Sequence, residues 1–135
     1  MLFRSPERQA LVEKAAQAAV DLHLPGAVSP SELGNWYRNA RIVAVPSLRE
    51  GFGLVAAEAA AAGRAVVASA VGGIPEVVVD GSSGLLVEPG QVEDLAAALR
   101  SVDPQWGKNG PSRVSQLGMG AHGETVSKIC DKLIQ

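Results

Sequence analysis

The sequence has few of the residues that disulfide-rich, nucleic-acid-binding or membrane proteins need. Its 135 residues include one cysteine, which cannot form an internal disulfide and favours a reducing compartment. A net charge of -2 gives no basic surface for nucleic acid. The N-terminal sequence lacks the apolar centre of a signal peptide, and no apolar run reaches the roughly 18–20 residues that cross a bilayer. We therefore expect a cytoplasmic protein without a nucleic-acid partner.

Motifs for several common chemistries are also absent. There is no G-x-x-x-x-G-K-[ST] phosphate loop and no G-x-S-x-G turn for a hydrolytic serine. No Asp-x-Asp pair is present to hold a metal–nucleotide complex. His23, His122 and Cys130 lack the spacing of metal ligands, and a lone cysteine on an apolar helix face is most often part of a core. We therefore expect no metal site and no bound cofactor.

Aromatic residues make up only 4% of the chain against 47% hydrophobic residues, so alanine, valine and leucine must fill the core. Two dense aliphatic runs, RIVAVPS (41–47) and RAVVASAV (64–71), predict buried parallel strands. The alanine-rich segment Leu54–Ala62 between them predicts a crossover helix, with Gly63 as its C-terminal stop. This order predicts an α/β fold with a Rossmann-like parallel sheet and crossover helices.

The flanking segments extend this alternation. Ser5 and Ser29 each precede a proline that begins a predicted helix, and Ser29 forms a capping box with Glu32. Alternation of Val20, Leu22 and Leu24 with polar residues predicts a short strand. Later elements are predicted from local signals: a short helix at 75–79, a turn at Asp80-Gly81, a strand at 84–87, and helices at 91–102 and 124–134. Residues 105–123 show little periodicity.

The segment LREGFGLVAAEAAAAGR (48–64) follows the first aliphatic run. In open α/β sheets, ligands bind beyond the carboxyl ends of the strands, where this loop is expected. Gly51 and Gly53 allow the backbone to approach a ligand, and the helix N-terminus behind them offers unbonded N–H groups. These features predict a phosphate site. The alternative is a plain strand-to-helix turn in which Glu50 stabilises the helix dipole.

Glu58 lies within the same helix, with alanine on both sides. A carboxylate on a helix that packs on a sheet must reach solvent or find a partner, because burying an unpaired charge is costly. Two vicinal hydroxyls of a ribose are one suitable partner, as for the acidic residue of dinucleotide folds. The alternative is an idle, solvent-facing glutamate. Trp36 and Tyr37 are expected to pack in the preceding helix rather than to stack on a ligand.

Both glutamates belong to a longer pattern, VPSLREGFGLVAAEAAAAGRAVVASAVGGIPEVVVDGSSGLLVEPG (45–90). It resembles the donor-binding domain of retaining GT-B glycosyltransferases, the family of glycogen synthase, sucrose synthase and bacterial mannosyl- and glucosyltransferases. The defining motif of that family is two glutamates separated by seven residues, here Glu50 and Glu58. The GGIPE and DGSSGLLV segments match the family pattern too, and the resemblance covers roughly Ser5 to Val102.

The resemblance implies a role for each matching residue. Glu58 would bind the ribose hydroxyls of a UDP- or GDP-linked sugar, and Glu50 would contact the sugar ring as the catalytic residue. The remaining donor contacts would come from backbone groups of Gly51, Phe52, Gly53, Leu54 and, at the nucleobase, Val28. Such enzymes transfer the sugar with retained anomeric configuration and generally use no metal, which agrees with the missing Asp-x-Asp pair.

The resemblance also implies a partner. The family binds its acceptor mainly in an N-terminal domain, for which 135 residues leave no room. We therefore expect a truncated C-terminal domain, with a partial nucleotide-sugar-binding domain at 1–103 and a glycine-rich segment with a closing helix at 104–135. An N-terminal acceptor domain or a complementary chain would complete it, and any peripheral membrane association would come through that domain.

Three functional hypotheses follow from these features. The first is a donor-binding part that is inactive without its acceptor domain. The second is a non-catalytic relative that binds a nucleotide weakly or serves as an assembly module, with an exposed sheet edge available for a second copy. A flavodoxin-like signalling domain is disfavoured, because it would need an acidic cluster at the strand ends.

Overall fold

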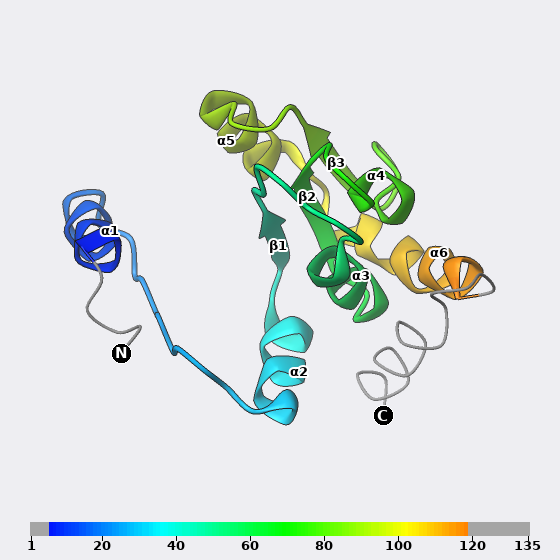
Figure 1. Ribbon diagram of the computed structural model, residues 1–135, viewed down its shortest axis with the longest axis horizontal. Coiled ribbons are helices and arrows are strands. Elements are labelled where there is room, and N and C mark those ends of the chain that lie inside the picture. The colour runs from blue at the N-terminus through cyan, green and yellow to red at the C-terminus, as the bar shows by residue number, and fades with distance from the viewer. Residues whose placement is uncertain (1–5, 119–135) are drawn as a thin grey trace. The chain divides into compact units, whose positions relative to one another are not determined.

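The computed structural model describes residues 6–118, which divide into two units between Leu33 and Gly34 (Figure 1). The first unit contains α1 (Pro6–Gln17), none of whose residues is buried. Arg8 Nη2 donates a hydrogen bond to the carbonyl oxygen of Leu24 at 3.0 Å. Residues 20–24 form no strand, so the strand predicted there is wrong. Among residues 6–118, no strand pairs with this alternating segment, and Val20 is 57% exposed.

Helix α2 (Pro30–Asn39) begins with the predicted capping box. The Ser29 N–H donates to Glu32 Oε2 at 2.8 Å, and the Glu32 N–H donates to Ser29 Oγ at 3.3 Å. These bonds satisfy two N–H groups that a helix start otherwise leaves unbonded. The backbone and hydroxyl donors of Ser29 also hold the pKa of the Glu32 carboxyl below its usual value. The other predicted cap, Ser5, lies outside the described residues.

The second unit contains a three-stranded parallel sheet in the order β1-β2-β3, which confirms the predicted fold class. Strand β1 (Ile42–Val45) pairs with β2 (Ala65–Ser69), and β2 pairs with β3 (Gly84–Val87). Each connection carries a helix: α3 (Leu54–Ala61) follows β1, and the short α4 (Ile74–Val77) follows β2. Helix α5 (Val92–Ser101) follows β3, close to the predicted bounds.

The sheet separates two cores (Figure 1). On one face, Val66 and Ala68 of β2 pack with α3, whose alanines are all at most 3% exposed. On the other face, Ala65 and Val67 pack with α5. Because successive side chains of a strand point to opposite faces, both faces of β2 are buried, as the aliphatic run predicts.

The outer edges of β1 and β3 differ in whether other backbone segments occupy their hydrogen-bonding groups. Strand β1 pairs only with β2 in the part of the chain that the structure describes, and Ala44 on it is exposed. The prediction of a fully buried strand is therefore wrong for β1, of which only Val45 is buried. The outer edge of β3 is blocked by the turn before it. Leu86 N–H donates to Asp80 Oδ1, and Gly81 N–H donates to the Gly84 carbonyl oxygen, both at 2.9 Å.

Helix α3 ends at the predicted glycine. The Gly63 N–H donates to Ala60 O and the Arg64 N–H donates to Ala59 O, each at 3.0 Å. This is the Schellman arrangement, which needs a left-handed residue after the helix, and Gly63 has φ of 72°. The local sequence signal was sufficient here because the bonds join residues within one turn.

Two helices occupy residues that lacked periodicity: the 3₁₀ helix η2 (Pro104–Asn109) and α6 (Gly110–Leu117). Their glycines are contact points. A Cβ on Gly107 would collide with the carbonyl oxygen of Gly63, and one on Gly110 with that of Ala60. These residues therefore pack backbone against backbone on the C-terminal end of α3. The closing helix predicted at 124–134 lies outside the described residues, and the division of the chain at residue 103 stays a prediction.

Gly84→Ala tests the same kind of close approach within the sheet. A Cβ at Gly84 would overlap the carbonyl oxygen of Val66 on the neighbouring strand. We expect the free energy of unfolding to fall by about 1–3 kcal/mol or more, measured by urea denaturation. Gly51→Ala is the matched control, because nothing lies within 4 Å of a Cβ there and its φ is not positive. Equal losses in both variants would contradict the steric explanation.

Candidate functional site

The predicted site is the connection between β1 and α3. Strand β1 ends at Val45, and α3 starts at Leu54 after Gly53, whose φ of 70° places it in the left-handed region. Glu50 is half-buried in this connection. Its Oε1 accepts from the Gly51 N–H at 3.0 Å, and its Oε2 lies 3.5 Å from Ser47 Oγ. The carboxylate is thus held by its own loop and stays at the carboxyl end of the strand.

A second loop supports this connection from behind. The Gly73 N–H donates to the carbonyl oxygen of Gly51 at 2.8 Å. A Cβ on Gly73 would lie 2.8 Å from the Phe52 carbonyl oxygen, and a Cβ on Gly72 would overlap that of Glu50. Gly72 also has a positive φ of 57°. Gly72 and Gly73 therefore allow the two backbones to touch, which explains the two glycines of the GGIPE segment.

The start of α3 faces this loop without a side-chain cap. Gly53 is the N-cap residue and supplies no side-chain hydrogen bond. The N–H groups of the first helical turn have no partner within the helix itself, so they form a site where an anion is favoured. Phe52 and Leu54 on either side are 65% and 41% exposed. The connection therefore presents N–H groups beside exposed apolar side chains.

Glu58 is neither idle nor fully exposed. Its carboxylate is half-buried, and its Oε2 accepts a hydrogen bond from the hydroxyl of Tyr37 on α2 at 2.8 Å. Tyr37 is 7% exposed and belongs to the core beneath α3. The expectation that Tyr37 packs is confirmed, whereas Trp36, which was expected to pack too, is 47% exposed. The Tyr37 hydroxyl adds a partner for Glu58 that the sequence did not reveal. The solvent-facing alternative for Glu58 is therefore wrong, and its role in binding a ligand stays a prediction.

This bond changes the acid–base behaviour of Tyr37. Burial raises the pKa of the Tyr37 hydroxyl well above its ordinary value, and the hydrogen bond to Glu58 and the charge of that carboxylate raise the pKa further. Each cause disfavours a phenolate, because a second negative charge would form in a dry site beside the first. The hydroxyl therefore remains a hydrogen-bond donor to Glu58 at physiological pH.

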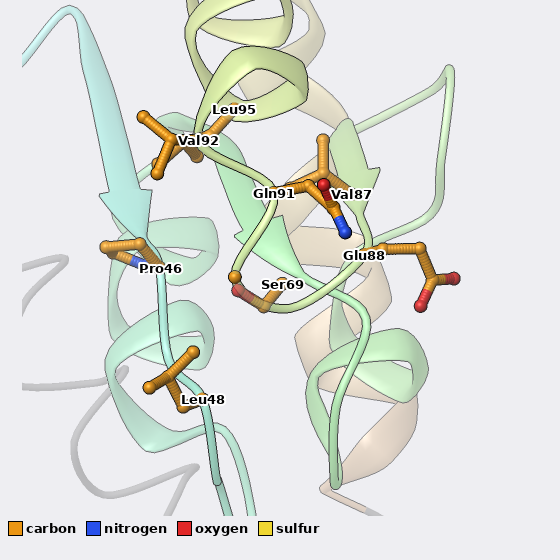
Figure 2. Close-up of a pocket in the computed structure, with 9 residues that line it drawn as sticks. Pro46, Leu48, Ser69, Val87, Glu88, Gln91, Val92 and Leu95 are labelled. Carbon is orange, nitrogen blue, oxygen red and sulfur yellow. The ribbon is translucent and has the colours of Figure 1, made fainter.

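A hollow of about 270 Å³ lies where all three strands end (Figure 2). Its lining comes from the ends of the strands and the first turn of α5, and includes Pro46, Leu48, Ser69, Val87, Val92 and Leu95. None of the predicted donor contacts lines it. Sequence reasoning missed this hollow, although the rule that ligands bind beyond strand carboxyl ends applies to all three strands and not only to β1.

The structure therefore brings together some of the predicted donor-binding residues. Glu50, Gly51, Phe52, Gly53 and Leu54 form one continuous connection, and Glu58 follows on α3. Val28 belongs to the first unit, and its contact with a nucleobase stays a prediction. Within residues 6–118, no cluster of three or more His, Cys, Asp or Glu residues could hold a metal ion. In the same range, no helix is long and apolar enough to cross a membrane.

The glycosyl transferases group 1 family model matches residues 4–102. The chain belongs to this family. The match includes the connection from β1 to α3 and the supporting glycines at 72–73, so the site geometry lies within the shared region.

Curated glycosyltransferases are similar to this chain over their shared region. A D-inositol 3-phosphate glycosyltransferase from Nocardioides sp. is 51% identical over 102 residues, covering 67% of this chain and 22% of that protein. One from Paenarthrobacter aurescens is 45% identical over 94 residues, covering 70% of this chain and 23% of that protein. The chain thus spans about a quarter of the length of these relatives.

Solved structures of glycosyltransferases share the fold. The C-terminal domain of a glycosyl transferase group 1 family protein from Francisella tularensis matches with a TM-score of 0.71 and 33% identity. That match covers 83% of this chain and 64% of that one. Sucrose-phosphate synthase from Thermosynechococcus elongatus matches with a TM-score of 0.75 and 35% identity, over 97% of this chain and 35% of that one. The α/β unit is therefore that of a GT-B C-terminal domain, as the resemblance implied.

The ionisation of Tyr37 tests the bond to Glu58, and it can be followed by phenolate absorbance because the chain has one tyrosine. We expect Tyr37 to stay protonated where an unfolded tyrosine, with a pKa of about 10, ionises. Its contribution to stability is then complete below pH of about 10 and is lost as the pH rises, because only the unfolded chain releases the proton.

Glu58→Gln should lower the pKa of Tyr37 toward the ordinary value without restoring it, because burial is the larger cause. Glu50→Gln serves as the control, since Glu50 bonds within its own loop and should leave the titration unchanged. An identical titration in wild type and Glu58→Gln would show that the two side chains do not interact in solution.

Proposed function

We propose that this family member binds a nucleotide-sugar donor at the connection from β1 to α3 and supplies the donor side of a sugar transfer. The observation that carries the proposal is the pair of half-buried glutamates on either side of an uncapped helix start. The glycines at 72–73 hold the loop in place, so the N–H groups and Glu50 keep fixed positions before any ligand arrives.

Each part of a nucleotide sugar has a chemical counterpart in this arrangement. The diphosphate would bind the N–H groups of the first turn of α3, where the helix dipole favours an anion. The ribose diol would donate to Glu58. Glu50 would accept hydrogen bonds from hydroxyls of the sugar ring. It would face the carbon at which transfer occurs, since it lies in the loop beyond the end of β1, just before Gly51.

We also propose transfer with retained configuration and without a metal, because the paired-glutamate loop resembles that of retaining enzymes. The acceptor would bind to a domain other than the one described, in the same chain or in a partner. The curated relatives act on D-inositol 3-phosphate by their names, so an inositol phosphate is the first acceptor to test. The anomeric configuration of the product, measured by NMR with an acceptor domain supplied, would test retention.

Calorimetry with the 135-residue chain tests donor binding directly. We expect saturable binding of at least one UDP- or GDP-linked hexose. Glu58→Gln should weaken it about ten- to a hundredfold, the value of a hydrogen bond to a charged group at 1.5–3 kcal/mol. Glu76→Gln is the matched control, because Glu76 is exposed on α4 and its side chain lies outside the proposed donor contacts.

Two outcomes would overturn the proposal. The first is no saturable binding of any of these nucleotide sugars to the folded chain. The second is binding that Glu58→Gln and Glu76→Gln weaken equally, which would favour the non-catalytic assembly module over a donor site.

A further inference from the structure

We propose that Tyr37 is a positioning residue for ribose recognition: it fixes the Glu58 carboxylate, so that the remaining acceptor positions select a vicinal diol. The proposal rests on the donor site proposed above and extends it to α2, which lies outside the paired-glutamate motif. It makes a distinct claim about sugar selectivity, which can fail while donor binding itself holds.

The geometry gives Tyr37 a fixed hydroxyl and Glu58 a flexible carboxylate. The Tyr37 ring is 7% exposed and packs in the core, so its hydroxyl cannot move far. Glu58 has a flexible, unbranched side chain that is only half-buried. The 2.8 Å bond from Tyr37 to Oε2 therefore restricts the rotamer of Glu58 before a ligand binds.

The hydrogen-bonding capacity of the pair suits a diol. An ionised carboxylate has about four acceptor positions, and the Tyr37 hydroxyl occupies one on Oε2. Among residues 6–118, the structure gives the Glu58 carboxylate one hydrogen bond, the one from the Tyr37 hydroxyl. Oε1 is thus available to one ribose hydroxyl. The second can donate to Oε2 or to the lone pairs of the Tyr37 oxygen, since that hydroxyl already uses its proton.

The positions of the two residues explain why this pair can act as a unit. Glu58 lies on the second turn of α3, one turn from the N–H groups that would hold the diphosphate. Tyr37 lies near the end of α2, just before β1. The pair is therefore built from the two helices that precede and follow β1, and it adjoins the loop that would hold the donor.

The test compares a ribonucleoside diphosphate with its dideoxyribose analogue by calorimetry, using the 135-residue chain. Wild type should bind the ribose form more tightly. Tyr37→Phe should weaken the ribose form about three- to tenfold, the ordering cost of one flexible side chain, and leave the dideoxy affinity unchanged. In a Glu58→Gln background, Tyr37→Phe should have no further effect on either ligand, because the carboxylate it positions is gone.

Trp36→Phe is the control from the same helix, because Trp36 is 47% exposed and next to Tyr37 in sequence. It should leave the ratio of ribose to dideoxy affinity unchanged. Equal weakening of both ligands in Tyr37→Phe would assign Tyr37 a purely structural role and overturn the proposal. If Glu58→Gln lowers the preference for the ribose ligand but Tyr37→Phe does not, this proposal is also overturned. The proposed donor site would then remain intact.

A second measurement avoids any change in packing. Because the chain has one tyrosine, biosynthetic fluorotyrosine labels position 37 alone. The ribose nucleotide should shift its fluorine NMR resonance, and the dideoxy analogue should shift it much less. A resonance that moves equally with both ligands would overturn the proposal, and absence of binding by either ligand would instead count against the donor site.

Discussion

The direct contact between two backbones behind the Glu50 loop is the constraint on which the site depends. Gly73 donates to Gly51 at 2.8 Å, and Gly72 and Gly73 leave no room for a Cβ. The contact ties the end of β1 and the start of α3 to the segment that follows β2. Any larger residue at either glycine would push the β1–α3 connection, which carries Glu50, away from the segment that follows β2.

The same constraint recurs through the unit because its core contains almost no large side chains. The alanines of α3 bring that helix close to the sheet, and glycines at 84, 107 and 110 each meet a carbonyl oxygen of a neighbouring segment. Small residues give little apolar area each, so stability depends on close packing over many contacts. With only 4% aromatic residues, the unit therefore packs through small residues that keep its backbone positions closely fixed.

Much of the fold could be predicted because its signals are local. The capping box at Ser29, the stop at Gly63 and the strand at 84–87 each depend on residues a few positions apart, and the structure confirms them. The strand predicted from Val20 to Leu24 is wrong because alternation alone cannot supply a neighbouring strand. The helices at 104–117 were hidden by glycines, which are there for packing rather than for turns.

The candidate site, too, could be predicted from the sequence only in part. The connection from Glu50 to Leu54 could be predicted because the strand, loop and helix follow one another in sequence. The partner of Glu58 could not, because Tyr37 is 21 positions away and reaches it only once two helices have packed on β1. The hollow at the strand ends was missed for a related reason, since its lining comes from three separate segments.

The difference between the outer edges of β1 and β3 has a consequence for assembly. Asp80 and Gly81 occupy the outer side of β3, while the outer side of β1 pairs with nothing among residues 6–118. A sheet with two open edges can add copies without limit, as fibrils do. A sheet that is closed on one side can be joined only once: two copies that meet through β1 leave no further edge, so such growth stops at a pair.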